Sequence, residues 1–453
     1  MLEDKLQQVL SNCDALSNPF VSKLRSLCMV PSVSAHGRSL QEAAEELRAI
    51  MVEVGLNAKM VKIPGGPDAL YGELPVQGAE KTLLIYNHYD VQPPDPLEEW
   101  VSDPFAADVR DGYIFARGVA DNKGAIVSRL GALKAILDAG ILPSANLKYF
   151  VEGEEEVGSP NLPKFISKER ELLRADGCLW EGGHKTPSGR PEIHAGVKGL
   201  LYVELSIETA DKDLHSSFAP LVPNPAWSLV QAIGSLRDGD GRIQIEGFHD
   251  DVIAPSAKEM TRMEKNEFDP EMLMKWAGVT SLLGSASSKD RAISLTFEPT
   301  CNLCGIDSGY KGQGSKTVLP RRATTKIDFR LVPNQDPDDI LAKLRKHLQD
   351  HDFGTIEIQV YSSEKPAKSD IDSNIVEAIT VSAQTVYGQT PNIWPSMPGT
   401  GPMTLFVDEL GIQCSMGVGV EHTGSGYHAP NENISIVDFT KGMKHAAALM
   451  LTF

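Results

Sequence analysis

The order of apolar patterns along the first half of the chain constrains its fold more than any other feature of the sequence. Residues 82–90, TLLIYNHYD, and residues 146–153, NLKYFVEG, are nearly continuous apolar runs, as in central strands that are covered on both faces. Residues 40–55 and 122–140 instead have apolar side chains at helical spacing, and both segments end at glycine. This alternation predicts an α/β fold, a mostly parallel sheet with helices on both faces.

The pattern changes near residue 197, after a loop rich in glycine and proline. Strands with clearer alternation and a few helices follow, and their order predicts a small α+β unit with a one-sided sheet over residues 197–370. Within it, a polar stretch up to about Arg291 is expected to be irregular. Residues 371–453 return to helix–strand alternation. A chain of 453 residues usually forms more than one domain. We therefore expect two units, and residues 371–453 could complete the sheet of residues 1–196, which would make residues 197–370 an insertion.

Composition excludes several classes of partner. The formal net charge of −18 argues against binding to nucleic acid or to anionic membrane surfaces, both of which attract basic proteins. No apolar run is long enough for a transmembrane helix, and the first residues do not resemble a secretory signal. The six cysteines are scattered, which is typical of a protein from the reducing cytoplasm. The CxxC spacing of Cys301 and Cys304 has no second pair of ligands nearby, so we interpret it as strand packing.

Carboxylates and histidines gather where the predicted strands end. Residues 152–156, EGEEE, place four glutamates within five positions directly after an apolar run. Side chains able to bind a metal follow other strands or precede the long helix: His88, Asp90, Asp121, Glu154 to Glu156 and Glu181. The carboxyl ends of parallel strands lie at one edge of a sheet, so these side chains are expected to converge. Carboxylates that lie close together raise one another's pKa, and a divalent cation removes that cost.

The types of ligand indicate which metal is bound. Histidine nitrogen with carboxylate oxygen, and no thiolate, suits zinc, manganese or cobalt better than calcium or magnesium. Asp90 lies two residues after His88, on the same side of the strand, where it can accept the second ring N–H of a histidine. An isolated strand histidine is more often a packed side chain, and a run of glutamates is more often a solvated surface. Their combination at consecutive strand ends favours a metal site.

Several motifs in order resemble one family of enzymes. They are NHYDVQPPDPLEEWVSDPF, ARGVADNKG, EGEEEVGS, DLHSS, FRLVPN and YHAPNENI. With them the chain resembles the di-zinc metallopeptidases that include carnosinase-type dipeptidases, succinyl-diaminopimelate desuccinylase, acetylornithine deacetylase and glutamate carboxypeptidase. It is most similar to the carnosinase-like branch, and the similarity covers nearly the whole chain.

The resemblance implies roles for individual residues at the metal site. His88, Asp121 and Glu181 would bind one metal, and Asp121, Glu156 and His428 would bind the other, so that Asp121 bridges the two. Glu155 would be the general base, and Asp90 would orient His88. Glu152 and Glu154 would have no catalytic role. The ions would be two divalent metals, zinc in the first place, with manganese or cobalt as alternatives.

The resemblance also implies how the substrate is bound. The inserted unit would be a lid and dimerisation domain, and His215 from the lid of a partner subunit would stabilise the oxyanion. Arg330 is the candidate for binding a terminal carboxylate of the substrate, with Thr317 and Thr400 as further polar contacts. The protein would then be a homodimer.

Two departures keep alternative substrates open. Glu181 stands where the dipeptidases of the carnosinase branch usually have aspartate, and SMPGTG replaces their REGGS loop, which removes its glutamate. We therefore expect an amide hydrolase that acts on dipeptides or short peptides, and keep N-acyl amino acids as the alternative substrate. A third hypothesis is a catalytically silent relative that serves as a binding protein. The sequence has no G-x-S-x-G, H-E-x-x-H or P-loop motif, which argues against those three chemistries.

Overall fold

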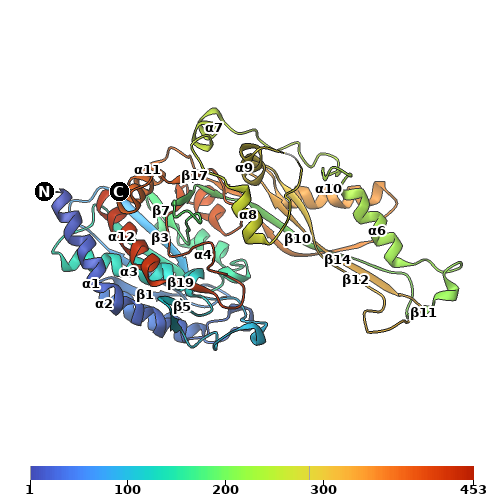
Figure 1. Ribbon diagram of the computed structural model, residues 1–453, viewed down its shortest axis with the longest axis horizontal. Coiled ribbons are helices and arrows are strands. Elements are labelled where there is room, and N and C mark those ends of the chain that lie inside the picture. The colour runs from blue at the N-terminus through green and yellow to red at the C-terminus, as the bar shows by residue number, and fades with distance from the viewer. Residues whose placement is uncertain (1, 285) are drawn as a thin grey trace.

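An eight-stranded sheet forms the centre of the first domain in the computed structural model, which describes residues 2–284 and 286–453 (Figure 1). In spatial order its strands are β1 (Asn57–Val61), β2 (Ala69–Leu74), β6 (Asn146–Glu152), β3 (Thr82–His88), β7 (Gly177–Trp180), β18 (Cys414–Met416), β8 (Glu192–His194) and β17 (Asn392–Trp394). The central pairs β6–β3, β3–β7 and β7–β18 are parallel, whereas β1 and β2 pair antiparallel at one edge. The predicted α/β class with a mostly parallel sheet is confirmed.

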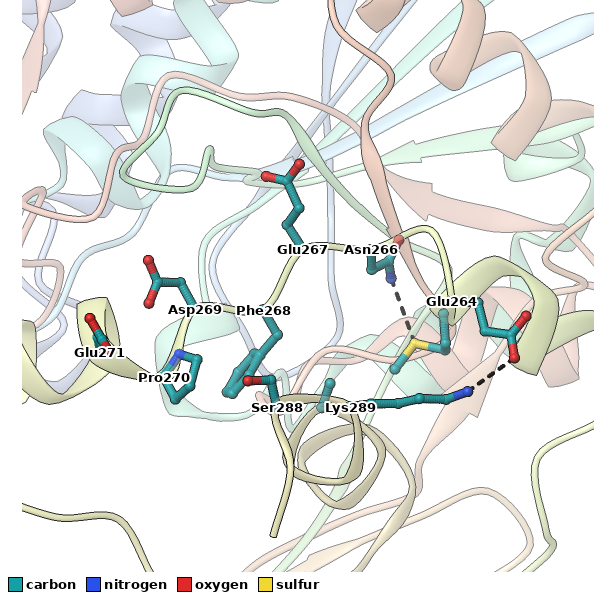
Figure 2. A pocket seen from close by; sticks show the side chains of 11 residues that line it. Glu264, Asn266, Glu267, Phe268, Asp269, Pro270, Glu271, Ser288 and Lys289 are labelled. Atoms are coloured by element: carbon teal, nitrogen blue, oxygen red, sulfur yellow. Dashed lines mark hydrogen bonds and ion pairs between the residues drawn. The ribbon is translucent and has the colours of Figure 1, made fainter.

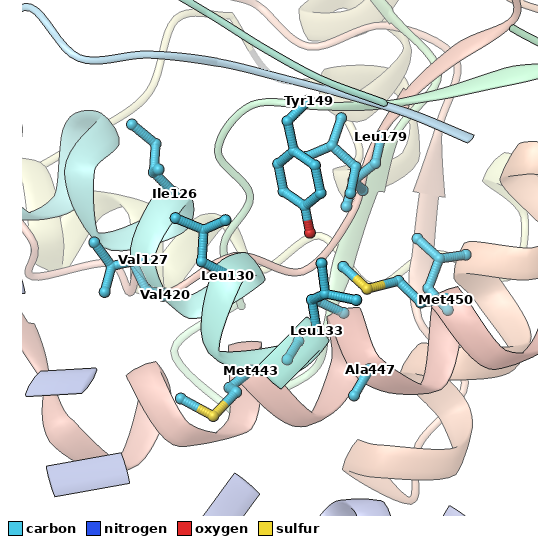
Figure 3. Close-up of a cluster of buried hydrophobic side chains, with 14 of the residues drawn as sticks. Ile126, Val127, Leu130, Leu133, Tyr149, Leu179, Val420, Met443, Ala447 and Met450 are labelled. Carbon is cyan, nitrogen blue, oxygen red and sulfur yellow. The ribbon is translucent and has the colours of Figure 1, made fainter. Parts of the chain in front are cut away.

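Helices cover both faces of this sheet, as predicted. One face packs against α1 (Leu2–Cys28), α2 (Leu40–Val54), α3 (Gly124–Asp138), α11 (Asn374–Tyr387) and α12 (Ile436–Thr452). In this layer Leu130 and Leu133 of α3 and Met443 of α12 lie under Tyr149 and Leu179 of the sheet (Figure 3). The other face packs against α4 (Leu162–Lys168), α5 (Arg170–Leu173) and the segment from residue 403 to 412. Both faces of the strands are therefore buried, which explains their continuous apolar runs.

The C-terminal segment completes the first sheet. Strand β18 pairs with β7, and α12 packs against α3 and α1, so the two ends of the chain lie in the same part of the molecule (Figure 1). A smaller sheet joins β19 (Asn433–Ser435) to β5 (Tyr113–Phe115) and β4 (Asp108–Arg110). These pairings bring the residues around 428 next to segments from the first half of the chain.

A second, antiparallel sheet lies between these two parts of the sequence. Its strands are β12 (Thr300–Ser308), β14 (Arg322–Leu331), β10 (Gly199–Glu208) and β15 (Glu357–Glu364). Helices α6 (Pro225–Leu236) and α10 (Pro337–Asp350) cover one face, and buried and more exposed residues alternate along β10 and β14. The chain leaves and re-enters the first domain through the pairing of β9 (Gly196–Val197) with β16 (Ala367–Lys368). The exact boundaries at residues 197 and 370 stay a prediction.

The stretch expected to be irregular contains three helices. They are α7 (Ala257–Met263), α8 (Pro270–Ala277) and α9 (Ser288–Phe297). Ser256 and Glu259 form a capping box that starts α7, and Ser287 and Asp290 form one that starts α9. These helices are only seven to ten residues long, and the caps that start them were the usable signal.

Two further features of the described residues bear on the sequence predictions. None of the helices described has both the length and the apolar character that crossing a membrane requires. All six cysteines are free thiols, and the CxxC pair lies within β12, with Cys301 buried and Cys304 exposed.

Candidate metal centre and active site

The carboxyl ends of three parallel strands carry the candidate ligands. His88 is the last residue of β3, Glu152 ends β6 just before a 3-10 turn at Glu155–Val157, and Glu181 follows the end of β7. Because β6, β3 and β7 are neighbours and parallel, these ends lie at the same edge of the sheet. The order of strands therefore gathers side chains that are far apart in sequence.

Asp121 lies at the middle of the gathered side chains. Its Oδ1 is 3.0 Å from Nε2 of His88, and its Oδ2 is 3.1 Å from Nε2 of His428. The residue sits in the turn Val119–Lys123 before α3, with φ −115° and ψ 90°. His428 has a φ of 62°, which is uncommon for residues other than glycine and is often found at functional sites. Each oxygen of Asp121 thus faces a different histidine.

Two more carboxylates complete the set on either side of Asp121. Oε2 of Glu181 is 3.5 Å from Nε2 of His88, and Oε2 of Glu156 is 3.1 Å from Nε2 of His428. Ligand atoms of His88, Asp121 and Glu156 all lie within 4.8 Å of one another. The structure therefore brings all five predicted ligands together as two overlapping groups that share Asp121. That they bind metal stays a prediction.

The electrostatics of the cluster fit a pair of divalent cations. Burial raises the pKa of Glu181 to about 8, and Asp121 adds to this while His88 opposes it. Burial and the charge of Asp121 likewise raise the pKa of Glu156. Oε2 of Glu181 is buried and has no hydrogen-bond partner among the described residues, although Trp180 Nε1 donates to Oε1 at 3.2 Å. Buried carboxylates of this kind need opposite charge, and histidine with carboxylate ligands suits zinc, manganese or cobalt.

Asp90 makes more contacts in the site than its predicted role of orienting His88 requires. Its Oδ1 is 3.4 Å from Nδ1 of His88, as expected for a carboxylate that orients the ring. Its two oxygens also accept the backbone N–H groups of Glu155 at 3.2 Å and Glu156 at 3.1 Å. One buried carboxylate therefore fixes both a candidate ligand and the turn that carries the candidate base.

Glu155 points toward the cluster, beneath the loop around residue 400. A Cβ atom built on Gly401 would lie 3.4 Å from Oε1 of Glu155 and 3.5 Å from Oε1 of Glu181. Burial, followed by the charge of Glu181, raises the pKa of Glu155 well above its ordinary value. Two other glutamates of EGEEE have structural partners, because Tyr86 and Ser159 donate to Glu152, and Asn161 donates to Glu154. The neighbouring glutamates of this run therefore differ in what their side chains contact.

The predicted substrate-binding residues fall into two places. Arg330 and Thr400 come together, since Nη1 of Arg330 donates to Oγ1 of Thr400 at 2.7 Å. This contact joins the inserted sheet to the loop that covers Glu155. His215 and Thr317 are exposed and lie near each other at the two-stranded pairing of β11 (Leu214–His215) with β13 (Val318–Leu319), at the far end of the inserted domain (Figure 1). The single chain does not bring them to the metal ligands, so their roles stay predictions that require a partner subunit.

Glu432 is a residue of the site that the sequence reasoning missed. Its Oε1 accepts the backbone N–H groups of Ala120 at 2.8 Å and Asp121 at 3.1 Å. Its Oε2 accepts Gly118 N–H at 2.9 Å and Nη1 of Arg117 at 2.8 Å. The buried carboxylate thereby ties the turn of Asp121 to the segment of His428, four residues earlier in the YHAPNENI motif. Its place in that motif was the available signal.

Replacing Glu432 by alanine is expected to lower the free energy of unfolding by about 3–5 kcal/mol, because Arg117 and three backbone N–H groups lose their buried acceptor. Denaturant unfolding of the two proteins measures the difference. Glu80→Ala, at an exposed position, serves as the control and is expected to change stability little. A Glu432→Ala protein as stable as the control would contradict the role given to this carboxylate.

A separate pocket of about 740 Å³ lies between the residues before α8 and helix α9 (Figure 2). Its lining includes Phe268 and the pair Glu264–Lys289, whose charged atoms are 3.0 Å apart. None of the predicted site residues lines it. Near it, Trp276 of α8 donates to the carbonyl of Thr423, in the loop that leads to His428. The pocket is thus distinct from the candidate metal centre.

Known proteins resemble the chain over most of its length. The profile of Peptidase family M20/M25/M40 matches residues 84–452. The Beta-Ala-His dipeptidase of Rattus norvegicus is 25% identical, over 98% of this chain and 95% of its own length. The Cys-Gly metallodipeptidase DUG1 of Saccharomyces cerevisiae is 28% identical, over 99% of this chain and 98% of its own. The solved structure of an M20 family metallo-carboxypeptidase from Sulfolobus solfataricus is 43% identical and has a TM-score of 0.90, over 96% of this chain and 98% of that chain.

A histidine–carboxylate cluster at the edge of a parallel sheet, with a second domain inserted beside it, is the arrangement of a metal-dependent hydrolase. The match over residues 84–452 makes the assignment more specific, and the chain belongs to Peptidase family M20/M25/M40. It is a metallopeptidase, as the ordered motifs predicted. Its similarity to the two dipeptidases confirms the resemblance to the carnosinase-like branch.

Proposed function

We propose that the protein hydrolyses the amide bond of dipeptides with two divalent ions, zinc in the first place and manganese or cobalt as alternatives. The observation that carries the proposal is the position of Asp121, with one carboxylate oxygen facing His88 and the other facing His428. Relatives described as dipeptidases over nearly the full length of the chain support the choice of substrate. His88, Asp121 and Glu181 would hold one ion, and Asp121, Glu156 and His428 the other.

Divalent ions in this site would supply the Lewis acidity that acidifies water and polarises the scissile carbonyl. Glu155 would accept a proton from the attacking water at its carboxylate and return it to the leaving amine. Asp90 keeps that carboxylate in place through the backbone of the turn. Arg330, with Thr400 beside it, would bind the carboxylate of the substrate, because a guanidinium forms paired hydrogen bonds with carboxylates.

The proposed assembly is a homodimer that forms through the inserted domain. His215 is exposed and far from the metal ligands of its own chain, so its predicted role in stabilising the oxyanion requires the partner's centre (Figure 1). Thr317 lies beside it and would contact the same substrate. The free state of all six cysteines supports our proposal of a reducing compartment, the cytoplasm.

His215→Ala is expected to lower kcat by about 10²–10³-fold with metal content unchanged, the usual cost of losing an oxyanion donor. Steady-state kinetics and elemental analysis measure the two quantities. Mixing this variant with Glu155→Gln tests the trans arrangement, because in a mixed dimer one of the two centres then has both residues intact. Activity that does not recover in dimers shown to have exchanged subunits would contradict the role of the partner.

An N-acyl amino acid deacylase is the second candidate, and Glu181 favours it because the deacylases and carboxypeptidases that the chain resembles usually carry glutamate there. A panel of dipeptides and N-acyl amino acids, assayed with zinc, manganese and cobalt, separates the two. We expect higher kcat/KM for dipeptides. Faster cleavage of N-acyl amino acids would replace the first candidate by the second, and no cleavage of either class by metal-loaded protein would refute both.

A further inference from the structure

Two side chains of opposite charge occupy equivalent positions on neighbouring strands of the inserted sheet. Leu200 of β10 is opposite Arg330 of β14 on one side and opposite Glu364 of β15 on the other. Residues that face each other across paired strands project to the same face of a sheet. Arg330 and Glu364 therefore share the face that α6 and α10 leave uncovered, with only Leu200 between them.

Both side chains reach the loops around Glu155. Arg330 donates to Thr400, and the next residue, Gly401, lies against Glu155, as shown by the 3.4 Å that would separate a Cβ there from Oε1. On the other side, a Cβ built on Gly158 would lie 3.5 Å from Oε1 of Glu364. Gly158 ends the turn of Glu155, and its N–H donates to the Glu155 carbonyl at 2.8 Å. The candidate base is thus flanked by a cation and by an anion.

Glu364 lacks a neutralising partner in the part of the chain that the structure describes. Its side chain is half-buried and accepts one hydrogen bond, from Oγ of Ser362 at 3.0 Å. Within residues 2–284 and 286–453 it forms no ion pair. Burial raises the pKa of this carboxyl, an effect that the hydrogen bond from Ser362 and the charge of Arg330 only oppose. A partly desolvated carboxylate gains most from a bound cation, because its lost hydration is then replaced.

The distance between the two charges suits a molecule that is two residues long and carries one charge at each end. Arg330 and Glu364 are two strand spacings apart, about 10 Å between backbones, and Nε of Arg330 also lies 3.4 Å from Oδ2 of Asp328. An extended dipeptide spans about 7 Å from end to end, and its single amide bond lies between its ammonium and its carboxylate. An N-acyl amino acid has the carboxylate but no ammonium.

We propose that Glu364 binds the free α-ammonium group of the substrate while Arg330 binds the carboxylate at its other end, so that the site selects unblocked dipeptides. This inference rests on the proposed function and names the substrate class within it. Each charged end of the dipeptide meets the opposite charge, and its amide bond is held over Glu155. Glu364 is thereby a specificity-determining residue that contacts the substrate.

Glu364→Gln tests the proposal with two probes that share a leaving group, alanyl-leucine and N-acetyl-leucine. The substitution keeps the size and one hydrogen-bond acceptor of the side chain but removes its charge. We expect kcat/KM for alanyl-leucine to fall about tenfold to a hundredfold, mainly through KM, because the contact of the ammonium with a charged carboxylate becomes a weaker one with a neutral amide. N-acetyl-leucine, as substrate or as competitive inhibitor, is expected to bind as it does to the wild type. Metal content should not change.

Glu357→Gln, at the exposed start of the same strand, is the matched control and should leave both probes unaffected. Equal losses for the two probes, or no loss for alanyl-leucine, would overturn the proposal for Glu364 while leaving amide hydrolysis in place. If the metal-loaded wild type cleaves neither probe nor any other dipeptide or N-acyl amino acid, the proposed function itself fails, and this inference fails with it.

Discussion

Glu155→Gln is expected to lower kcat by about 10²–10⁴-fold while both metal ions stay bound. Glutamine has the same shape as glutamate, but it cannot accept the proton of the attacking water. The backbone of residue 155 would still donate to Asp90, so the turn and the neighbouring ligand Glu156 should keep their positions. Steady-state kinetics on a dipeptide, together with elemental analysis of the same preparation, provide the measurement.

The adjacent residue supplies a matched control for this substitution. Glu154→Gln makes the same chemical change one position earlier, where the side chain accepts from Asn161. We expect it to keep nearly the full rate. A Glu155→Gln enzyme with a near-normal kcat, or one that has lost its metal, would show that Glu155 is not the base.

Asp121→Ala is expected to abolish activity and the binding of both ions. Asp121 is the residue placed against both histidines, so its removal takes one ligand from each of the two groups. Glu181→Ala is the comparison, because Glu181 faces only one of the two histidines, His88. Its loss should therefore weaken the binding of one ion. Metal content after dialysis against a buffer of low metal concentration measures both effects. Two ions retained by the Asp121→Ala protein would refute the bridging role.

The parts of the site that follow from strand order were predictable from the sequence. His88 and Glu181 come directly after continuous apolar runs, and the parallel pairing of β3 with β7 then places them at one edge. His428 lies 307 residues after Asp121, and no local pattern connects the two. Only the ordered motifs that resemble a known family identified it, and the return of β18 and α12 to the first sheet is what brings it back.

Other contacts depend on tertiary packing, which no local sequence pattern predicts. No local pattern indicated the role of the Glu432 carboxylate, because its four donors lie about 310 residues away in sequence. The hydrogen bond between Arg330 and Thr400 joins two domains, and its existence depends on how the inserted sheet is oriented. Helices α7 to α9 were missed because each is only seven to ten residues long. For Glu432 and for Arg330, the residues that they contact are distant in sequence.

Calorimetric titration of the metal-free wild-type protein with zinc tests the central claim most directly. Two ions per chain should bind, and Tm should rise with them, because ligands that bind only the folded state stabilise it. The Asp121→Ala protein should bind neither ion under the same conditions. A wild-type protein that binds no zinc, or one whose zinc binding is unchanged in the Asp121→Ala protein, would contradict a metal centre built on this residue.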